Sequence, residues 1–375
     1  MTRVFYGMSG PSVKPACEAL CWPAMRSARL RAVATIYDVA REAQVSLATV
    51  SAVINASAYV SPGLKNRVTS AIRKLEYQPN LLARSLATQQ TRTLGMIAPN
   101  IANPFWPEVV RGVEDGAHAA GYTLLLASSD DDRAKESLYL RMFLAKRVDG
   151  LLLCKTAGGL DADIAARIRT TRTPLVQMMR SSRACAGDRV LVDEEGGSYE
   201  AVAHLLRLGY RRIAMINGVS HVSTSRNRLK GYRSALKDAG IPFDPSLIAD
   251  GEFRVDPGYD AGIRLLKKKP DAVFIGNYLM TVGFMRALRQ YQLRCPDDIG
   301  IVTCDDYPWL DEFHPRLTTV NLPKYELGQA AARALIARIE PEEARLPRRS
   351  RVIVLKTTLC LRESCGYERG RPKGR

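Results

Sequence analysis

The chain has 375 residues, and its 55 Lys and Arg against 38 Asp and Glu give a formal net charge of +17. This length exceeds one small domain and suits a small module followed by a larger two-lobed unit. The basic balance favours contact with nucleic-acid phosphates, although charge alone is weak evidence because Arg-rich chains are common in some genomes. The absence of a run of about 18 or more apolar residues excludes a membrane span.

Residues 1–33 show neither a helical nor a strand period, and they lack the continuous apolar core of a signal peptide. We therefore expect a cytoplasmic protein that begins with a disordered extension. A translation start at Met25, which leaves a short basic arm, is the alternative. The eight Cys and four His show no metal-type spacing, so we predict reduced cysteines, no metal site and no cofactor.

Residues 34–55 are predicted to form two short amphipathic helices joined by a tight turn. The first helix has apolar residues at i, i+3, i+4 and i+7, namely Ile36, Val39, Ala40 and Ala43. Thr35 and Ser46 are suitable N-caps for the two helices. In the second helix Val50 and Val53 point to the core, which leaves an outward face of Leu47, Ala48, Ser51, Ala52 and Asn55. The period alone is equally compatible with a helical hairpin that binds nothing.

A third helix is expected from Ser61, with Pro62 at its first position and Leu64, Val68, Ile72 and Leu75 as its apolar face. Three short helices make the small closed core of a helix-turn-helix DNA reader.

The segment that follows carries a family signature. The pieces T-I-Y-D-V-A from Thr35, V-S-x-A-T-V-S in the second helix and Y-x-P-N-x-x-A-R-S-L-A from Tyr77 resemble the lac repressor family of transcription regulators. The resemblance continues to about Cys365. It implies a sequence-specific DNA-binding regulator, most often a repressor, that is not an enzyme and whose operator affinity is controlled by a small ligand.

From Thr93 onward, short apolar runs alternate with helical stretches. The runs are residues 94–99, 122–128, 148–154, 174–178, 212–218, 272–277 and 299–305, and helices are expected at 108–120, 135–146 and 226–239. Continuous apolar strands between helices predict parallel sheets covered on both faces. There are too many strands for one compact sheet, so we expect two similar α/β lobes.

The resemblance implies two Rossmann-like lobes of the periplasmic-binding-protein type, with crossovers near Val192–Asp193, near Thr319–Val320 and near residues 340–348. The expected domains are an extension (1–33), the helix-turn-helix module (34–79), a hinge helix and linker (80–91), the first lobe (92–192 with about 320–345), the second lobe (193–319 with about 346–365) and a basic tail (366–375).

Ligand would sit between the lobes, at the carboxyl ends of the strands. Aromatic rings after the first strand suit the apolar face of a sugar or base, although core packing explains each ring singly as well. The expected effector contacts are Asn100, Phe105, Trp106, Asp193, Thr224, Arg228, Phe253, Asn277 and Asp305. Tyr278 stands where many relatives have Asp, so the resemblance does not identify a particular ligand. A carbohydrate or polyol is favoured, and a nucleobase or sugar acid is the alternative.

One helix-turn-helix covers few base pairs, so a homodimer on a near-palindromic operator is expected. The tail after Leu361 contains no leucine heptad of the kind that joins dimers into tetramers in some relatives. Ala52 stands where many relatives carry Arg, and alanine cannot make the bidentate contact of arginine with guanine. We therefore expect operator recognition to depend more on contacts from Leu47 and Ala48 to thymine methyl groups and on DNA shape. The expected DNA contacts in the module are Thr35, Tyr37, Ser46, Leu47, Ala48, Thr49, Ser51, Ala52 and Asn55. The hinge would add Asn80, Ala83, Arg84 and Leu86, with Leu86 wedged in the minor groove.

Two other classes fit the lobes. A solute-binding protein of a transport system would share them, but it needs export and no DNA reader. An enzyme would need a catalytic motif, and the sequence contains no GxxxxGK[ST], GxSxG or HExxH segment.

Overall fold

The computed structural model describes residues 34–55, 58–78, 90–156, 158–312, 314–340 and 350–367. The predicted extension (1–33), most of the hinge with Asn80, Ala83, Arg84 and Leu86, and the end of the tail lie outside these residues. The chain divides into two compact units, one up to Arg84 and one from Ser85 onward. None of the described helices has the length and apolar character needed to cross a membrane.

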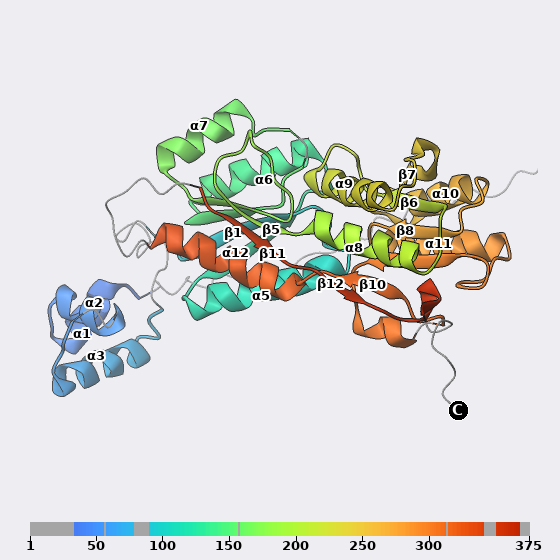
Figure 1. The fold of residues 1–375 in the computed structure, drawn as a ribbon. Coiled ribbons are helices and arrows are strands. Elements are labelled where there is room, and N and C mark those ends of the chain that lie inside the picture. Colours follow the sequence, from blue (N-terminus) through green and yellow to red (C-terminus); the bar gives the residue numbers. More distant parts are fainter. Residues whose placement is uncertain are drawn as a thin grey trace, which may run out of the picture. The chain divides into compact units, whose positions relative to one another are not determined.

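The first unit is a three-helix module built from α1 (Ile36–Ala43), α2 (Leu47–Asn55) and α3 (Pro62–Lys74) (Figure 1). Thr35 caps α1 in a capping box with Asp38, as predicted. The Oγ of Ser46 accepts a hydrogen bond from the Thr49 amide at 3.1 Å and so caps α2. Ser61 precedes α3 with Pro62 at the first position, but its side chain makes no capping bond.

The core of this module follows the predicted apolar pattern. Val39, Ala43, Val50 and Val68 are buried, together with Ala71, which the sequence interpretation had not named. Gln44 adopts a left-handed backbone between α1 and α2, and its carbonyl accepts a hydrogen bond from Arg67 at 2.9 Å. This bond ties the turn to α3.

The second unit contains two six-stranded sheets, each with helices on both faces (Figure 1). The first sheet has the order β11-β5-β4-β3-β1-β2 and all its pairs are parallel. Its strands are β1 (Thr93–Ala98), β2 (Thr123–Ser128), β3 (Gly150–Leu153), β4 (Leu175–Met178), β5 (Asp188–Val192) and β11 (Val352–Leu355). Its helices are α5 (Phe105–Ala119), α6 (Arg133–Ala145), α7 (Ala162–Thr171) and α12 (Lys324–Ile339).

The second sheet has the order β12-β10-β9-β8-β6-β7 and is parallel except for its edge pair β10–β12. Its strands are β6 (Ile213–Asn217), β7 (Ile248–Asp250), β8 (Ala272–Ile275), β9 (Gly300–Cys304), β10 (Thr318–Asn321) and β12 (Thr358–Cys360). Its helices are α8 (Glu194–Arg207), α9 (Ser223–Asp238), α10 (Val255–Leu266) and α11 (Tyr278–Gln290). The strands and helices predicted from apolar runs are therefore present, and the two-lobed α/β architecture is confirmed.

The chain passes between the lobes three times. It crosses between β5 and α8, and again between β10 and α12. The third crossing corrects the prediction of residues 340–348, because β11 pairs in parallel with β5 and belongs to the first sheet. The crossing falls instead between β11 and β12, at Lys356 and Thr357. Residues 352–355 thus belong to the first lobe, not to the second.

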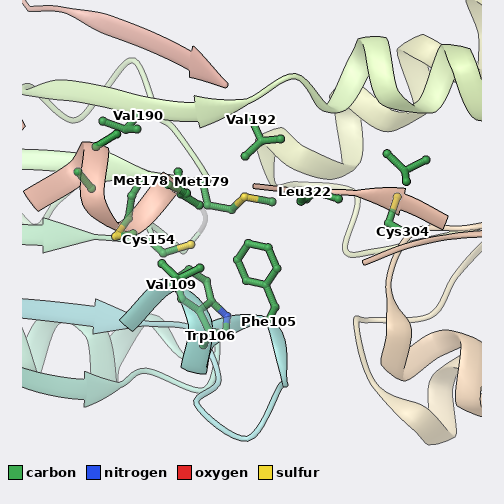
Figure 2. Packing of buried hydrophobic residues seen from close by; sticks show 14 of the residues in the cluster. Phe105, Trp106, Val109, Cys154, Met178, Met179, Val190, Val192, Cys304 and Leu322 are labelled. Atoms are coloured by element: carbon green, nitrogen blue, oxygen red, sulfur yellow. The ribbon is translucent and has the colours of Figure 1, made fainter. Parts of the chain in front are cut away.

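One large hydrophobic cluster runs through both lobes. It contains Leu94 and Val176 in the first sheet and Phe274 and Val302 in the second. Figure 2 shows part of this cluster, with Phe105 beside the first lobe's buried side chains and Cys304 on the other side.

Candidate functional site

Two regions of the chain carry candidate binding residues, and the first is the surface of α2. Tyr37 and Leu47 are 65% and 38% exposed, and Ala48 is exposed beside Leu47. Exposed apolar side chains on a helix that follows a tight turn suit contact with the methyl groups of a base-pair edge. Ser51 and Ala52 are half-buried on the same helix.

Several predicted DNA contacts also have roles within the module. Asn55 donates to the carbonyl and the hydroxyl of Ser51 at 3.0 and 3.2 Å. The hydroxyls of Ser46 and Thr49 lie 2.9 Å apart, and the hydroxyl of Thr35 donates to Asp38 at 2.7 Å. These three hydroxyls therefore shape the helix ends, and each keeps an exposed or half-exposed position.

The second region is a cleft between the lobes. Eight of the nine predicted effector residues line it: Asn100, Phe105, Trp106, Thr224, Arg228, Phe253, Asn277 and Asp305. They come from elements far apart in the sequence, but all follow the carboxyl ends of strands or begin the next helix. Phe105 and Trp106 are buried and lie edge to face, with ring centroids 5.3 Å apart.

Asp193 is the exception and corrects the prediction. It is the N-cap of α8, and its carboxylate accepts a hydrogen bond from the Gly196 amide at 2.9 Å. Asp193 is not among the residues that line the cleft. The neighbouring Glu194, which the sequence interpretation had not selected, serves the cleft instead through its ion pair with Arg228.

Buried donors without partners face this site. Arg228 donates to Glu194 from Nε at 2.5 Å and from Nη2 at 2.9 Å, and both side chains are 3% exposed. The Nη1 of Arg228 and the hydroxyl of Thr224 have no hydrogen-bond partner within the described residues, although both are buried. Buried polar groups are almost always satisfied, so two orphans lining one cleft indicate a place for a polar ligand.

The Phe253 ring contacts guanidinium groups from both lobes. Arg180, which follows β4, has its guanidinium carbon 5.3 Å from the ring centroid, and Arg228 of α9 lies at 5.8 Å. Such cation–π contacts stabilise the position of the ring next to the two arginines. Gly218 makes this position possible, because a Cβ there would lie 1.8 Å from the Phe253 ring.

The backbone around the cleft is strained. Within the described residues, six cleft residues have positive φ although they are not glycine: Asp130, Asp131, Met179, Glu252, Phe253 and Asp305, with φ between 53° and 75°. This conformation is costly for L-residues and tends to persist at functional sites, where the surrounding structure enforces it. Here it turns side chains at the strand ends into the cleft.

Asp305 is a carboxylate in an unusual setting. It is 2% exposed and accepts a hydrogen bond from the Tyr278 amide at 3.2 Å. Burial raises the pKa of Asp305 above its ordinary value, while Arg228 and Lys324 oppose the shift. A buried acceptor of this kind suits the hydroxyl groups of a ligand. The Tyr278 ring itself packs against Tyr307 and Trp309 instead of lining the cleft.

The sequence interpretation missed several lining residues, chiefly Asp130, Asp131, Arg180, Glu252 and Arg254. Each of these residues stands shortly after a predicted apolar run or after β7. A position just after a strand end was therefore the signal that could have identified them. Arg180 pairs with Asp131 across two loops of the first lobe. Loops carry no period, and therefore no pattern distinguished these residues from ordinary surface charges.

The space left between the cleft side chains is about 60 Å³, room for about two water molecules. A larger ligand therefore requires that side chains of the cleft or the lobes move when it enters.

A three-helix DNA-reading module joined to two α/β lobes around a polar cleft defines a ligand-responsive transcription regulator. Residues 35–80 match the model of the lacI family of bacterial regulatory proteins, and residues 202–365 match the periplasmic binding protein-like domain. The ribose operon repressor of Escherichia coli (strain K12) is 39% identical over 312 residues, which cover 82% of this chain and 93% of that protein. The chain belongs to the lacI family of bacterial regulatory proteins.

Solved structures agree with this assignment. The lac repressor dimer bound to operator and the anti-inducer ONPF matches with a TM-score of 0.76 and 26% identity over 89% of this chain and 99% of that one. The transcriptional regulator CelR in complex with cellobiose matches with a TM-score of 0.65 and 32% identity over 88% and 99%. These relatives are regulators and not enzymes, and a match to the DNA-reading module weighs against a transport receptor.

Proposed function

We propose that this chain is a homodimeric repressor in the cytoplasm that binds a near-palindromic operator. Its affinity for the operator falls or rises when a polyhydroxylated ligand enters the interlobe cleft. The observation that carries the proposal is the combination of an exposed reading helix with a cleft that holds two buried donors without a partner among the described residues. The first supplies DNA recognition, and the second supplies the control of it.

On the DNA side, α2 is proposed to lie in the major groove. Leu47 and Ala48 would touch thymine methyl groups, while Ser51, Ala52 and Asn55 lie along the same helix. Thr35, Tyr37, Ser46 and Thr49 would contact phosphates from the exposed ends of α1 and α2. The hinge residues Asn80, Ala83, Arg84 and Leu86 are proposed to complete the contact in the minor groove.

On the ligand side, the chemistry of the cleft favours a carbohydrate. Asp305 supplies a buried acceptor, Arg228 and Thr224 supply donors, and Phe105 and Trp106 supply aromatic faces. Sugars present hydroxyl groups around an apolar ring face and need all three. The names of two relatives, the ribose operon repressor and CelR with cellobiose, point to the same class.

The cleft also explains how a ligand would act at a distance. Arg180 comes from the first lobe, and Arg228 and Phe253 come from the second. A ligand that replaces their contacts changes the relative free energy of two lobe arrangements. The free energy that couples a ligand site to a distant site is typically about 1–3 kcal/mol. It arises only if the ligand binds the two lobe arrangements with different affinity.

Selection of binding sites from random duplex DNA with the purified full-length protein tests the DNA function. Enrichment of a near-palindrome is expected. Ala48→Asp should abolish the enrichment, while Ser70→Asp on α3, which adds the same charge, should retain part of it. No enrichment from folded protein, with or without added ligands, would contradict the proposal. The enriched site then serves as a fluorescent probe against neutral sugars, sugar acids and nucleobases.

A further inference from the structure

A second cavity lies at the boundary of the lobes, next to the cleft. It has a volume of about 590 Å³, much larger than the space left in the cleft. The two share only Arg180. The lining comes from both lobes, with residues after β3 and β4 on one side and the start of α9 on the other.

The charge of this cavity is one-sided. The lining includes Lys155, Arg180, Arg183, Arg189 and Arg226, with His221, and among the residues that the structure describes it contains no Asp or Glu. The cleft is different, because four carboxylates, Asp130, Asp131, Glu252 and Asp305, stand among its arginines. Mutual repulsion makes a group of like charges around a cavity unfavourable unless a counter-charge enters.

Two of these cations are already neutralised. Lys155 pairs with the buried Glu136, and Arg180 pairs with Asp131. Arg226 donates to the His221 carbonyl at 2.6 Å, which leaves its charge unbalanced. Within the described residues, the guanidinium groups of Arg183 and Arg189 have no ion-pair partner. Three unbalanced guanidinium groups therefore surround one cavity.

Neutral donors accompany the arginines. Ser181, Ser182 and Ser223 line the cavity, and the Ser181 amide donates to the Ser223 Oγ at 2.9 Å across the lobe boundary. Val222 and Ser223 mark the start of the 16-residue helix α9, which has no side-chain cap. Guanidinium forks, hydroxyls and the uncapped start of a long helix are together the groups that proteins use to hold phosphate.

We propose that this cavity is a binding site for a phosphate dianion, either as the free ion or as the phosphate of a ligand that reaches past Arg180 from the cleft. The dianion accepts hydrogen bonds from Arg183 and Arg189 of the first lobe and from Arg226 and Ser223 of the second. Because both lobes hold it, the anion stabilises their approach. Because Arg180 borders both cavities, occupancy of one changes the affinity of the other, and the effect is reciprocal.

Isothermal titration of the full-length protein, at constant ionic strength in chloride buffer, tests the site with inorganic phosphate, ribose and ribose 5-phosphate as probes. The test variant is Arg183→Gln with Arg226→Gln, which removes one exposed arginine from each lobe. The matched control is Arg169→Gln with Lys237→Gln, which removes one exposed cation from each lobe outside the cavity. Thermal unfolding and circular dichroism confirm that both variants fold.

Saturable phosphate binding that weakens at least tenfold in the test variant and not in the control supports the site. Binding of ribose 5-phosphate at least tenfold tighter than both other probes, with the same dependence, assigns the phosphate to a ligand that spans the cavities. Equal binding by test variant and control, or no binding of either phosphate probe, overturns the proposal. No DNA enters this experiment, so its outcome is separate from that of the operator selection.

Discussion

The guanidinium of Arg228 and the carboxylate of Glu194 form a two-point ion pair at 2.5 and 2.9 Å that is almost completely removed from solvent. The pair joins the starts of α8 and α9, and Nη1 of the arginine has no hydrogen-bond partner in the described part of the chain. Burial disfavours both charges, and it raises the pKa of Glu194 against the opposing effect of Arg228. The pair is therefore costly to maintain and holds the arginine in place for a ligand.

Removing one member of this pair should destabilise the protein strongly. Arg228→Ala leaves the Glu194 charge buried, and the expected loss in unfolding free energy is about 3–5 kcal/mol. The exposed pair of Arg286 and Asp256, at 3.3 Å with both side chains more than half exposed, is the control. Arg286→Ala should cost less than about 1 kcal/mol. Urea unfolding measures both, and equal losses would contradict the buried-pair account.

Close packing of α5 on α12 leaves no room for a side chain at Gly112. A Cβ at Gly112 would lie 2.1 Å from the Tyr325 carbonyl oxygen, and one at Gly328 would lie 2.1 Å from that of Val109. Gly112→Ala should cost about 1–3 kcal/mol through overpacking. At Gly63 in α3 nothing lies within 4 Å of an added Cβ, so Gly63→Ala should be neutral or stabilising by about 0.5–1 kcal/mol. Thermal unfolding of the two variants checks the expected difference in sign.

The base preference of α2 should change when Ala52 becomes arginine. Ala52→Arg supplies a bidentate donor for guanine, and discrimination at one operator position should rise by about 1–3 kcal/mol. Ser70→Arg on α3 adds the same charge and should at most strengthen binding to all sequences alike. Site selection with both variants distinguishes the outcomes. An unchanged preference with Ala52→Arg would show that this position does not reach the bases.

Acid should weaken the junction of β5, β11 and α12 at Asp188. Burial acts to raise the pKa of Asp188, but hydrogen bonds from Arg338, at 2.5 and 2.9 Å, and from the Arg351 amide, at 2.8 Å, lower it below its ordinary value. A lowered pKa means that the carboxylate stabilises the fold above about pH 4, the unfolded value, and loses this effect as pH falls further.

Asp188→Asn should therefore cost about 2 kcal/mol at pH 7, and the difference from the natural chain should shrink as pH falls below 4. Urea unfolding between pH 3 and 7 follows it. The exposed Asp260→Asn serves as a control whose difference should stay near zero. A difference for Asp188→Asn that is independent of pH would mean that the charge contributes nothing.

Much of the cleft could be predicted from strand ends and from the family resemblance. Asn100, Phe105 and Trp106 were selected because they follow the first strand, and Asn277 and Asp305 because they match positions of the family. All five line the cleft. The error at Asp193 has a simple physical cause. Adjacent acidic residues at a helix start look alike in sequence, but one caps the helix while the next, Glu194, points to the arginine.

The sequence alone determined the local structure of the chain. The helical spacing in residues 34–55, the caps at Thr35 and Ser46, and the alternation of apolar runs with helices depend on neighbours within a few positions. Motifs of adjacent residues likewise sufficed for the family. Such signals need no knowledge of where the chain goes next.

Only the tertiary structure decided which distant residues meet. Strand β11 joined the first sheet because a parallel partner was free at β5, a choice that no local period records. The contacts of Phe253 with Arg180 and Arg228, and the cations around the second cavity, bring together residues from loops, strand β5 and helix α9 of the two lobes. Charges scattered along a chain become a site only when long-range packing brings them together, because the interaction of two charges weakens with the distance between them.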